Sequence, residues 1–500
     1  MKSYLIPWFI LLPTISFSQL QLAGIFSDNM VLQRDKPINI WGKAAPGNTI
    51  TITFSNETVN TTADKDSSWF VRFPRKNADG KPLILKVSTK EENIVLQNMI
   101  MGDVWLCIGQ SNMEWPMQRE MHYAEERSNS DRPMLRFFNP SYAGKNIYAS
   151  PFTDSVIQRL EPQHFYNGHW QPCDSLSMKD MSAVAYYFGK SIAAETGVPI
   201  GLINLSIGGA PLETFIDPGA LSEHEQFASK VKGDWLQNPT LPVWVRERGR
   251  QNVGDHVNVP GDAQGKHHAY KPGFAYKAGI EPLLRMPIKG ILNYQGESNA
   301  QEADRVNEYA ALTALMVDGY RKKWELPYLP YYFVQLSSID TAKYKGHLWP
   351  KFRDEQRKTL SLIPHSGMAV SSDVGAKDDV HPTNKKDVGE RLARWALYGT
   401  YGRNIVPSGP LPLQAKYKKD KVIVTFRYAA TALMTADDRP VRGFSFDGST
   451  EVEGRLDKKR VILETRDRPG LLYYGWKPFS DANLINSEKL PASTFRIKVK

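Results

Sequence analysis

Hydrophobic and polar residues follow three different patterns along the chain. From residue 20 to 100, short runs alternate between apolar and polar positions, as in INIWGKAAPGNTITITF around its Pro-Gly turn. Such alternation, with turn residues between the runs, is typical of strands that bury one face. We therefore predict an N-terminal β domain of sandwich type over residues 19–100.

In the middle of the chain, apolar runs with strand character alternate with helical patterns. The strand-like runs occupy residues 103–108, 199–205, 288–293, 329–335 and 367–371. Apolar residues recur on one helical face in three segments, 181–197, 302–324 and 384–398. The first of these helices is predicted to stop at Gly197. Strands alternating with helices need crossover connections, so we predict an α/β domain with a parallel sheet over residues 101–405.

Two further regions have patterns of their own. Residues 210–280 are rich in Pro, Gly and aromatic side chains, which favours a lid or an insertion within the α/β domain. From 406 to 500 the alternation returns in KVIVTFRY, VRGFSFDG and KRVILET. This pattern predicts a second sandwich-like β domain at the C-terminus. A length of 500 residues fits such a multidomain arrangement.

The first residues have the pattern of a secretory signal. Lys2 precedes an apolar stretch from Tyr4 to Ile15, and small residues follow before Gln19. The stretch is short and broken by proline, so it suits membrane crossing poorly. We predict a signal peptide over residues 1–18 and an exported mature chain, periplasmic or extracellular, with no membrane span after cleavage. A retained membrane anchor is the alternative.

The charge of the chain bears on the kind of molecule that it binds. The chain has 63 basic and 53 acidic residues, a formal charge of +10, and the basic residues are scattered. Scattered charge argues against a nucleic-acid partner, although a diffuse positive field can attract an acidic glycan.

Two cysteines make no disulfide framework. Cys107 is predicted to be a core residue, and pairing with Cys173 stays open, as does the oligomeric state.

A group of histidines lies in the Gly/Pro-rich segment DHVNVPGDAQGKHHAYKPG. We expect His256, His267 and His268 to belong to a surface loop rather than to a metal site. No cysteine or histidine spacing in the chain is typical of zinc. The sequence therefore predicts neither a metal nor a cofactor.

Polar residues that can do chemistry follow four of the predicted strands. In parallel sheets, ligands bind outside the carboxyl ends of the strands. Each cluster alone has a simpler explanation, such as a helix cap, a turn or a loop, but their shared position favours one common site. The clusters are Gln110, Ser111 and Asn112 after the first strand, Ser206, Gly208 and Gly209 after the second, Gln295, Glu297 and Asn299 after the third, and Asp378, Asp379 and His381 after the fifth.

A serine needs a base before it becomes a nucleophile, and His381 is the candidate base. A carboxylate on the other ring nitrogen would orient it, and either Asp378 or Asp379 is close enough in sequence. The attack creates an oxyanion, for which we expect the backbone N–H groups of Ser111 and Gly209 and the Gln295 amide as donors. Residue 113 is Met, so Ser111 is not in a Gly-x-Ser-x-Gly elbow, which argues against an ordinary α/β-hydrolase.

The motifs GQSNM, the Gly-Gly pair, YQGESN and DVHP resemble the blocks of the SGNH-hydrolase superfamily, and more narrowly the sialate O-acetylesterase-like carbohydrate esterases. The likeness extends over nearly the whole mature chain. It implies a flavodoxin-like, three-layer α/β/α core flanked by the two β domains. It implies Ser111 as nucleophile, His381 as base, and Gln295 with a glycine of the 208–209 pair as oxyanion donors.

The resemblance leaves the acid open. The superfamily pattern Asp-x-x-His selects Asp378, whereas the narrower family's Asp-hydrophobic-His pattern selects Asp379. Further residues are expected to bind substrate or to orient the site: Gln110, Asn112, Glu297 and Asn299.

The function implied is that of a serine esterase. It would remove O-acetyl groups from a carbohydrate through an acetyl-enzyme intermediate. Acetylated sialic acid and acetylated plant polysaccharides such as xylan or xyloglucan both remain open as substrates. The alternative is a catalytically inactive glycan-binding protein on a hydrolase scaffold.

Overall fold

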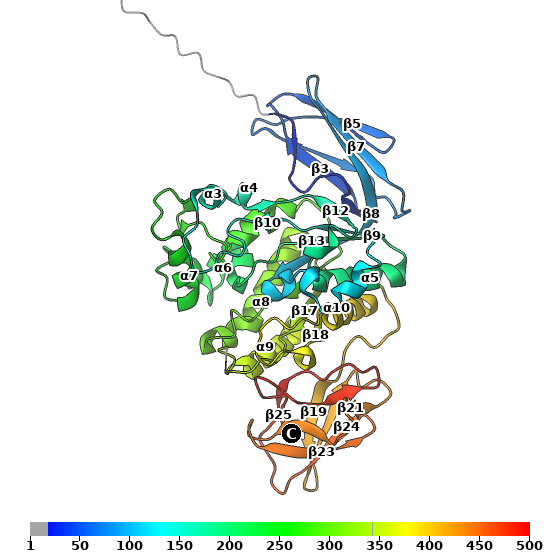
Figure 1. The fold of residues 1–500 in the computed structure, drawn as a ribbon, viewed down its shortest axis with the longest axis vertical. Helices are drawn as coiled ribbons and strands as arrows, with labels where there is room; N and C mark the ends of the chain where they lie inside the picture. Colours follow the sequence, from blue (N-terminus) through cyan, green and yellow to red (C-terminus); the bar gives the residue numbers. More distant parts are fainter. Residues whose placement is uncertain (1–18, 343) are drawn as a thin grey trace, which may run out of the picture.

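The computed structural model describes residues 19–342 and 344–500, so the predicted signal peptide lies outside the described residues. The molecule is elongated, with the N-terminal strands at one end, a mixed α/β part in the middle and the C-terminal strands at the other end (Figure 1). Among the residues described, no helix is long and apolar enough to cross a membrane.

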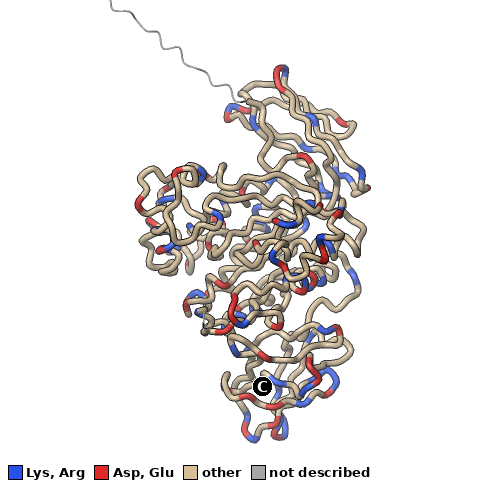
Figure 2. Tube along the Cα trace, viewed as in Figure 1, with Lys and Arg blue, Asp and Glu red and all other residues tan. Residues whose placement is uncertain are grey.

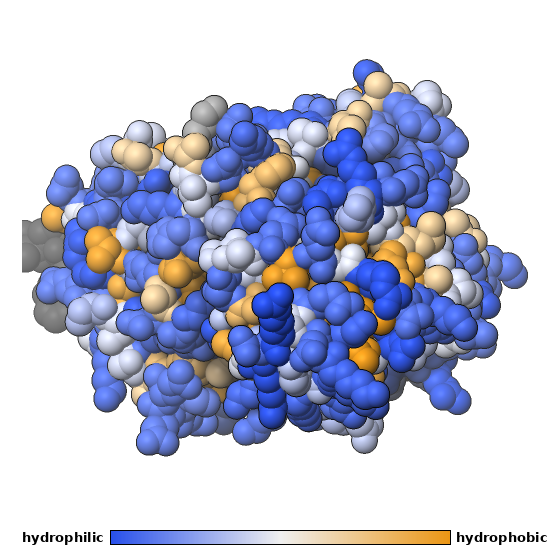
Figure 3. All heavy atoms as spheres, turned by 90° about the horizontal axis from the view of Figure 1, so that it is seen from below, coloured by the Kyte–Doolittle hydropathy of each residue, from blue (hydrophilic) through white to orange (hydrophobic). Residues whose placement is uncertain are grey.

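The surface carries a mixture of charged, polar and apolar groups. Lys and Arg are interspersed with Asp and Glu along the whole chain trace (Figure 2). Seen from below the C-terminal end, hydrophilic residues cover most of the face, and apolar ones occur in small groups among them (Figure 3). The scattered charge inferred from the sequence is therefore also scattered in space.

The N-terminal strands form two sheets. One contains β1, β3 and β6, and in the other β4, β5, β7 and the first half of β8 pair antiparallel, with β2 parallel to β8. In β4 the isoleucines are buried and the threonines face outward, as the alternation predicts. The strands are β1 (Gln21–Leu22), β2 (Val31–Gln33), β3 (Ile38–Lys43), β4 (Thr49–Phe54), β5 (Glu57–Thr62), β6 (Ser68–Phe73), β7 (Leu83–Ser88) and β8 (Asn93–Gly109).

Strand β8 continues without a break into the central sheet. Its second half is buried throughout and pairs in parallel with β13 and β16. The sheet has the order β12-β9-β13-β8-β16-β17-β18, in which only β12 is antiparallel to its neighbour. The additional strands are β9 (Arg132–Phe138), β12 (Trp170–Cys173), β13 (Ile200–Asn204), β16 (Gly290–Tyr294), β17 (Tyr331–Gln335) and β18 (Ser366–Val370). All five predicted strands of this region are confirmed.

Strand β9 is a member of the sheet that the sequence pattern did not predict. Its segment RPMLRFF contains Arg136, whose side chain is buried and donates to the Asn29 carbonyl and the Asn98 side chain. A charged residue at a buried strand position interrupts the apolar run, so the usual signal is lost.

Helices pack against the sheet in two pairs. α5 and α10 contact each other, with α5 on β9 and β13 and α10 on β17 and β18, whereas α8 contacts α9, which also packs on β17 and β18. The helices are α5 (Ala183–Thr196), α8 (Ala303–Lys323), α9 (Trp349–Leu362) and α10 (Lys386–Gly399). The three predicted helices are confirmed, including the stop at Gly197 with φ +67°. Helix α9 was not predicted, because three of its buried positions are charged: Arg353, Asp354 and Glu355.

Residues 210–280 form short helices and loops. Here the prediction of a surface loop is wrong for His267 and His268, which are both buried. The His268 ring stacks on Phe152 and Trp235, so aromatic packing encloses it. The short elements of the central part are α1 (Ser111–Glu114), α2 (Tyr123–Arg127), β10 (Ser141–Tyr142), α3 (Asp154–Ile157), α4 (Pro162–Phe165), β11 (Tyr166–Asn167), α6 (Pro218–Glu223), α7 (Val243–Val253), β14 (Gly261–Asp262) and β15 (Gly265–Lys266).

The C-terminal strands form a barrel-like sheet rather than the predicted sandwich. The order is β19-β20-β24-β23-β22-β25-β27, and the two end strands meet through the bridge between Ala415 and Val499. Strand twist brings the sheet edges together. A separate pair, β21 with β26, lies beside it. The strands are β19 (Leu411–Tyr417), β20 (Lys421–Arg427), β21 (Leu433–Thr435), β22 (Val441–Ser445), β23 (Glu451–Asp457), β24 (Arg460–Glu464), β25 (Leu471–Tyr474), β26 (Leu484–Asn486) and β27 (Phe495–Lys498).

The hydrophobic core is divided unequally. One cluster runs from Leu20 to Leu411 and joins the N-terminal strands to the central part, whereas the C-terminal strands enclose a cluster of their own. Cys107 and Cys173 are both buried and free, so they do not form a disulfide.

Candidate active site

Ser111 stands at the first position of α1, directly beyond the buried end of β8. Gly109, the last residue of that strand, has φ +133°, and a Cβ there would lie 2.2 Å from the Tyr294 carbonyl oxygen. Glycine is therefore required for the sharp turn out of the sheet. The turn leaves Ser111 half-buried at the carboxyl end of the strand.

His381 lies in the loop between β18 and α10, and the structure brings it against Ser111. Its Nε2 is 2.8 Å from Ser111 Oγ. On the other side of the ring, Nδ1 is 3.3 Å from Asp379 Oδ1, which also accepts the His381 backbone N–H at 2.8 Å. With Nδ1 protonated toward Asp379, Nε2 is left as the acceptor for the serine hydroxyl. Asp378 lies in the same loop with its side chain exposed.

The surroundings of His381 favour its neutral form. Burial and the nearby Lys385 ammonium lower its pKa below the ordinary value, and Asp379 opposes this shift. The imidazole stacks on Trp115 with ring centroids 5.2 Å apart and planes 18° apart. A neutral, fixed imidazole is the state in which a histidine can accept the proton of a serine.

The two glycines after β13 have different roles in the structure. The Gly208 N–H donates to Tyr142 Oη at 3.1 Å, and the Gly208 carbonyl accepts from Tyr270 Oη at 2.8 Å. Gly209 has φ +72°, and a Cβ there would lie 2.3 Å from Tyr270 Oη. Among residues 19–342 and 344–500, the Gly209 N–H has no hydrogen-bond acceptor. Gly209 therefore keeps an uncommitted donor in this loop.

The amide of Gln295 is turned toward other protein groups. Its Nε2 donates to Asn299 Oδ1 at 2.8 Å and lies 3.3 Å from both the Ala210 carbonyl and Gln110 Oε1. Gln110 Oε1 also accepts the Ser298 N–H at 3.2 Å. In this structure Gln295, Gln110 and Asn299 thus hold neighbouring loops together, and the Gln295 hydrogens are not directed at Ser111.

Ser206, from the cluster after β13, also has a local partner. Its hydroxyl donates to Asn204 Oδ1 at 2.6 Å, on the same stretch of chain.

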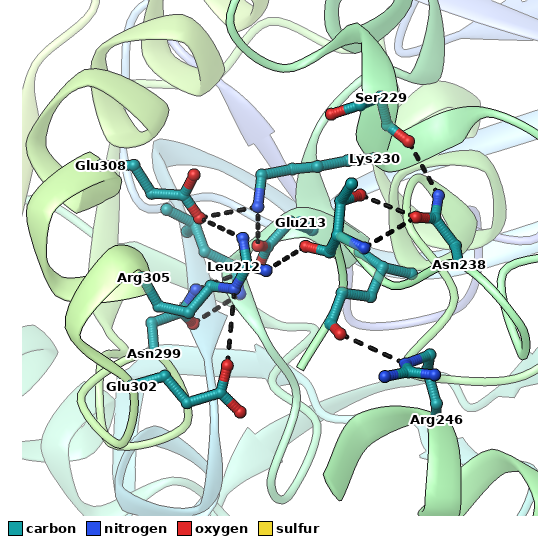
Figure 4. Close-up of polar contacts among 12 residues, drawn as sticks. Leu212, Glu213, Ser229, Lys230, Asn238, Arg246, Asn299, Glu302, Arg305 and Glu308 are labelled. Atoms are coloured by element: carbon teal, nitrogen blue, oxygen red, sulfur yellow. Dashed lines mark hydrogen bonds and ion pairs between the residues drawn. The ribbon is translucent and has the colours of Figure 1, made fainter. Parts of the chain in front are cut away.

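A buried ion-pair cluster fixes the loop that follows Gly209. Asn299 accepts the Leu212 N–H at 3.0 Å and donates to Glu213 Oε2 at 3.0 Å. Lys230 Nζ lies between Glu213 at 3.0 Å and Glu308 at 2.6 Å (Figure 4). Because the charges of Glu213 and Lys230 are buried and paired, the loop is held in one position.

A second buried cluster lies behind the nucleophile. The Asn112 amide donates to Glu297 Oε1 and to the Val380 carbonyl, and its oxygen accepts from Lys385 Nζ. Burial raises the pKa of Glu297 to about 7. Burial lowers the pKa of Lys385 to about 7, although the Glu297 carboxylate opposes this shift.

The structure thus brings Ser111, His381 and Asp379 together. The residues predicted to bind substrate or to orient the site are buried next to them: Gln110, Asn112, Glu297 and Asn299. Lys385 and Trp115 were not among the residues predicted from the sequence, and Glu213 was given no role. A charged residue just before an amphipathic helix usually faces solvent, so only its burial distinguishes Lys385. Within the described chain, no group of three or more His, Cys, Asp or Glu is arranged to hold a metal ion.

Comparison with known proteins gives consistent matches. Residues 271–398 match the family described as carbohydrate esterase, sialic acid-specific acetylesterase. Sialate O-acetylesterase of Homo sapiens is 26% identical over 438 residues, covering 82% of this chain and 76% of the human protein. The corresponding enzyme of Mus musculus is 24% identical over 442 residues, covering 82% and 79%.

A solved structure is similar over nearly the whole chain. It is a carbohydrate acetylesterase from Xanthomonas citri with 30% sequence identity. The match covers 96% of this chain and 99% of that chain, with a TM-score of 0.77. The flanking β strands are therefore shared together with the central sheet.

Proposed function

The chain belongs to the sialate O-acetylesterase-like carbohydrate esterases of the SGNH-hydrolase superfamily and is a carboxylic ester hydrolase, and from this premise we propose that Ser111 is its nucleophile. The observation that carries the proposal is the 2.8 Å contact between Ser111 Oγ and His381 Nε2, made by residues 270 positions apart. Removal of acetyl groups from a carbohydrate is the activity of the family.

The proposed reaction proceeds in two steps. Ser111 Oγ attacks the acetyl carbonyl carbon while His381 Nε2 accepts the hydroxyl proton. The tetrahedral intermediate collapses by breaking the bond to the sugar oxygen, which takes the proton from His381. Water then attacks the acetyl-enzyme by the same route and releases acetate. Asp379, on Nδ1, stabilises the imidazolium that forms in each step.

The oxyanion donors we propose are backbone groups. The Ser111 N–H belongs to the first turn of α1, where helical N–H groups have no partner within the helix. The Gly209 N–H is uncommitted within the described chain. Gln295 would act as a third donor only by releasing a present partner, and each such donor is worth roughly 10²- to 10³-fold in rate.

The other residues predicted for the site are placed to orient it rather than to contact substrate. Gln110, Asn112, Glu297 and Asn299 are each at most 3% exposed. Their polar side-chain atoms bind groups of neighbouring loops, apart from Glu297 Oε2, which has no hydrogen-bond partner among the described residues. We infer that they fix the relative positions of the loops that carry Ser111, Gly209 and His381.

We also propose the finer architecture that the resemblance implies. The two helix pairs on the parallel sheet support a flavodoxin-like, three-layer α/β/α core. The proposed units are a β domain at 19–100, an esterase domain at 101–405 with a lid or insertion at 210–280, and a β domain at 406–500. Export to the periplasm or the extracellular space, after removal of 1–18, completes the proposal.

The substrate class divides into two possibilities. The mammalian relatives are named for acetylated sialic acid, and the bacterial relative for a carbohydrate. Acetylated sialosides and acetylated xylan or xyloglucan are therefore the substrates to compare. Acetate release from both sets under identical conditions would assign this chain to one class.

Hydrolysis of an aryl acetate tests the catalytic proposal. Ser111→Ala and His381→Ala should each reduce turnover by at least about 10³-fold, since the two groups act as a unit. Wild-type turnover in either variant would refute the mechanism. A wild-type protein that binds acetylated glycan but releases no acetate would instead favour the inactive glycan-binding alternative.

A further inference from the structure

Lys385 is a buried cation beside the proposed active site that the mechanism above does not use. Its side chain is fully buried just before the first turn of α10. Among the described residues, its ammonium group donates to one side-chain oxygen, Asn112 Oδ1. Its backbone N–H donates to Glu120 Oε1 at 3.3 Å, which fixes the residue from the other side.

Asn112 follows the nucleophile directly in sequence and connects two loops. Its Nδ2 donates to the Glu297 carboxylate and to the Val380 carbonyl, one residue before His381. The orientation of this amide decides which atom faces which partner. Because Lys385 can only donate, it holds the amide oxygen toward α10 and the amide nitrogen toward Glu297 and Val380.

Lys385 and His381 also share a neighbour. The Trp115 ring stacks on the His381 imidazole, and Lys385 Nζ lies 5.5 Å from the centroid of the same ring. The charged groups that act on His381 are Asp379 in its own loop, Lys385 before α10 and Arg119 in the turn Met117–Arg119. Of these, Lys385 and Arg119 disfavour the imidazolium and Asp379 favours it.

We propose that Lys385 is a positioning residue of the esterase, which holds the Asn112 amide so that Ser111 and His381 stay aligned, and whose ammonium group lies against the Trp115 ring that stacks on His381. The inference rests on the proposed function. It assigns Lys385 no contact with substrate. Burial lowers the pKa of Lys385 to about 7, so Lys385 is mostly charged below pH 7. This is the pH range in which the His381 imidazole becomes protonated from solvent.

The test is the pH profile of aryl acetate hydrolysis by Lys385→Met. We expect kcat to fall about 10- to 100-fold with little change in KM, because alignment is lost while binding is not. We expect the acid limb of kcat/KM to move upward by roughly half a pH unit, because removal of the positive charge lets the His381 pKa rise. Lys385→Arg should keep the acid limb in place.

Lys386→Met is the matched control. It removes the same charge one residue along, where the side chain acts on Glu390 rather than on His381, and it should leave both kcat and the acid limb unchanged. If Lys385→Met fails to fold, as judged by circular dichroism, Asn112→Ala carries the test. It should lower kcat without moving the acid limb upward, because Lys385 remains.

Two results would overturn the inference. One is a Lys385→Met enzyme with wild-type kcat and acid limb, and the other is an Asn112→Ala enzyme with wild-type kcat. In both cases an inactive Ser111→Ala variant would show that the esterase mechanism itself stands. Failure of the mechanism would appear differently, as wild-type turnover in Ser111→Ala.

Discussion

The Asp379 carboxylate beside His381 is mostly exposed to solvent, and this exposure limits how much it contributes to catalysis. Asp379 has a side chain 60% exposed to solvent, yet its Oδ1 faces Nδ1 at 3.3 Å. Water weakens such a pair, so its effect should be smaller than that of a buried acid in a serine hydrolase. The sequence did not distinguish between Asp378 and Asp379 as the acid, and kinetic measurements on a variant of each residue can do so.

Asp379→Asn should reduce kcat/KM about tenfold, and Asp378→Asn should reduce it less. The loss of the negative charge lowers the His381 pKa further, so the acid limb of the Asp379→Asn profile should move to lower pH. Steady-state kinetics from pH 5 to 9 on both variants measures the two effects. A larger loss in Asp378→Asn would assign the acid to that residue instead.

Gly209→Ala tests the loop that carries the proposed oxyanion donor. A side chain is strained at φ +72° and would meet Tyr270 Oη at 2.3 Å, so the peptide should rotate. We expect kcat to fall about 100-fold in a folded enzyme. At Gly208 a Cβ would meet the ends of three side chains, none nearer than Glu114 Oε2 at 3.1 Å, so Gly208→Ala should cost less activity. Equal losses in the two variants would contradict this assignment.

At the scale of elements, buried polar residues explain where sequence patterns did not predict the structure. Strand β9 contains Arg136, and helix α9 buries Arg353 and Asp354. Hydrophobic periodicity cannot identify such residues, because the two arginines donate to distant carbonyls and Asp354 accepts the distant Arg496 N–H. The two buried histidines of the 210–280 segment are a further example, because His267 bonds to the Leu160 carbonyl and His268 stacks on Phe152, both outside the segment.

His268 should make this segment sensitive to acid. Burial lowers its pKa to about 3, below the ordinary 6.5, so the folded state binds its proton less readily than the unfolded state. Stability is therefore lost as the pH falls from about 6.5 toward 3, by about 2 kcal/mol at pH 5. His268→Gln should shrink the difference in Tm between pH 7.5 and pH 5. The same substitution at the partly exposed His256 should leave the difference unchanged, and an undiminished difference in His268→Gln would contradict the assignment.

At the scale of the whole molecule, a buried guanidinium group lies where the C-terminal strands meet the centre, beside hydrogen bonds of Gln335 with the Thr494 backbone and of Asp354 with the Arg496 N–H. Arg353 donates to Ser338 Oγ at 3.0 Å and to the carbonyls of Gly475, Lys477 and Pro478. Burial lowers its pKa to about 9. Asp340, next to this contact, donates its N–H to the Lys377 carbonyl in the loop of His381. The position of the C-terminal part is thus connected to the active-site loop.

Arg353→Met should leave the Lys477 carbonyl without a donor among the described residues, whereas the Pro478 and Gly475 carbonyls keep the Ile339 N–H and the Thr494 hydroxyl, and it should destabilise the protein by roughly 1–3 kcal/mol. We expect a lower Tm and faster proteolysis near residues 400–410, between the two hydrophobic cores. Lys351→Met, an equal loss of charge at a partly exposed position of the same helix, should change neither. Unaltered proteolysis in Arg353→Met would show that other contacts hold the C-terminal part.

The sequence alone determined the alternation of strands and helices, the position of each chemical cluster at a strand end and the family. These are local features, because a strand pattern and a motif such as GQSNM are read within a few residues. Tertiary structure decided what depends on distant partners: the contact of Asp379 with Nδ1, the Gln295 amide turned away from Ser111, and the burial of Lys385 and Arg353. It also closed the C-terminal sheet into a barrel-like form. Hydrogen bonds and desolvation are set by the groups that surround a residue, and for these residues those groups come from other parts of the chain.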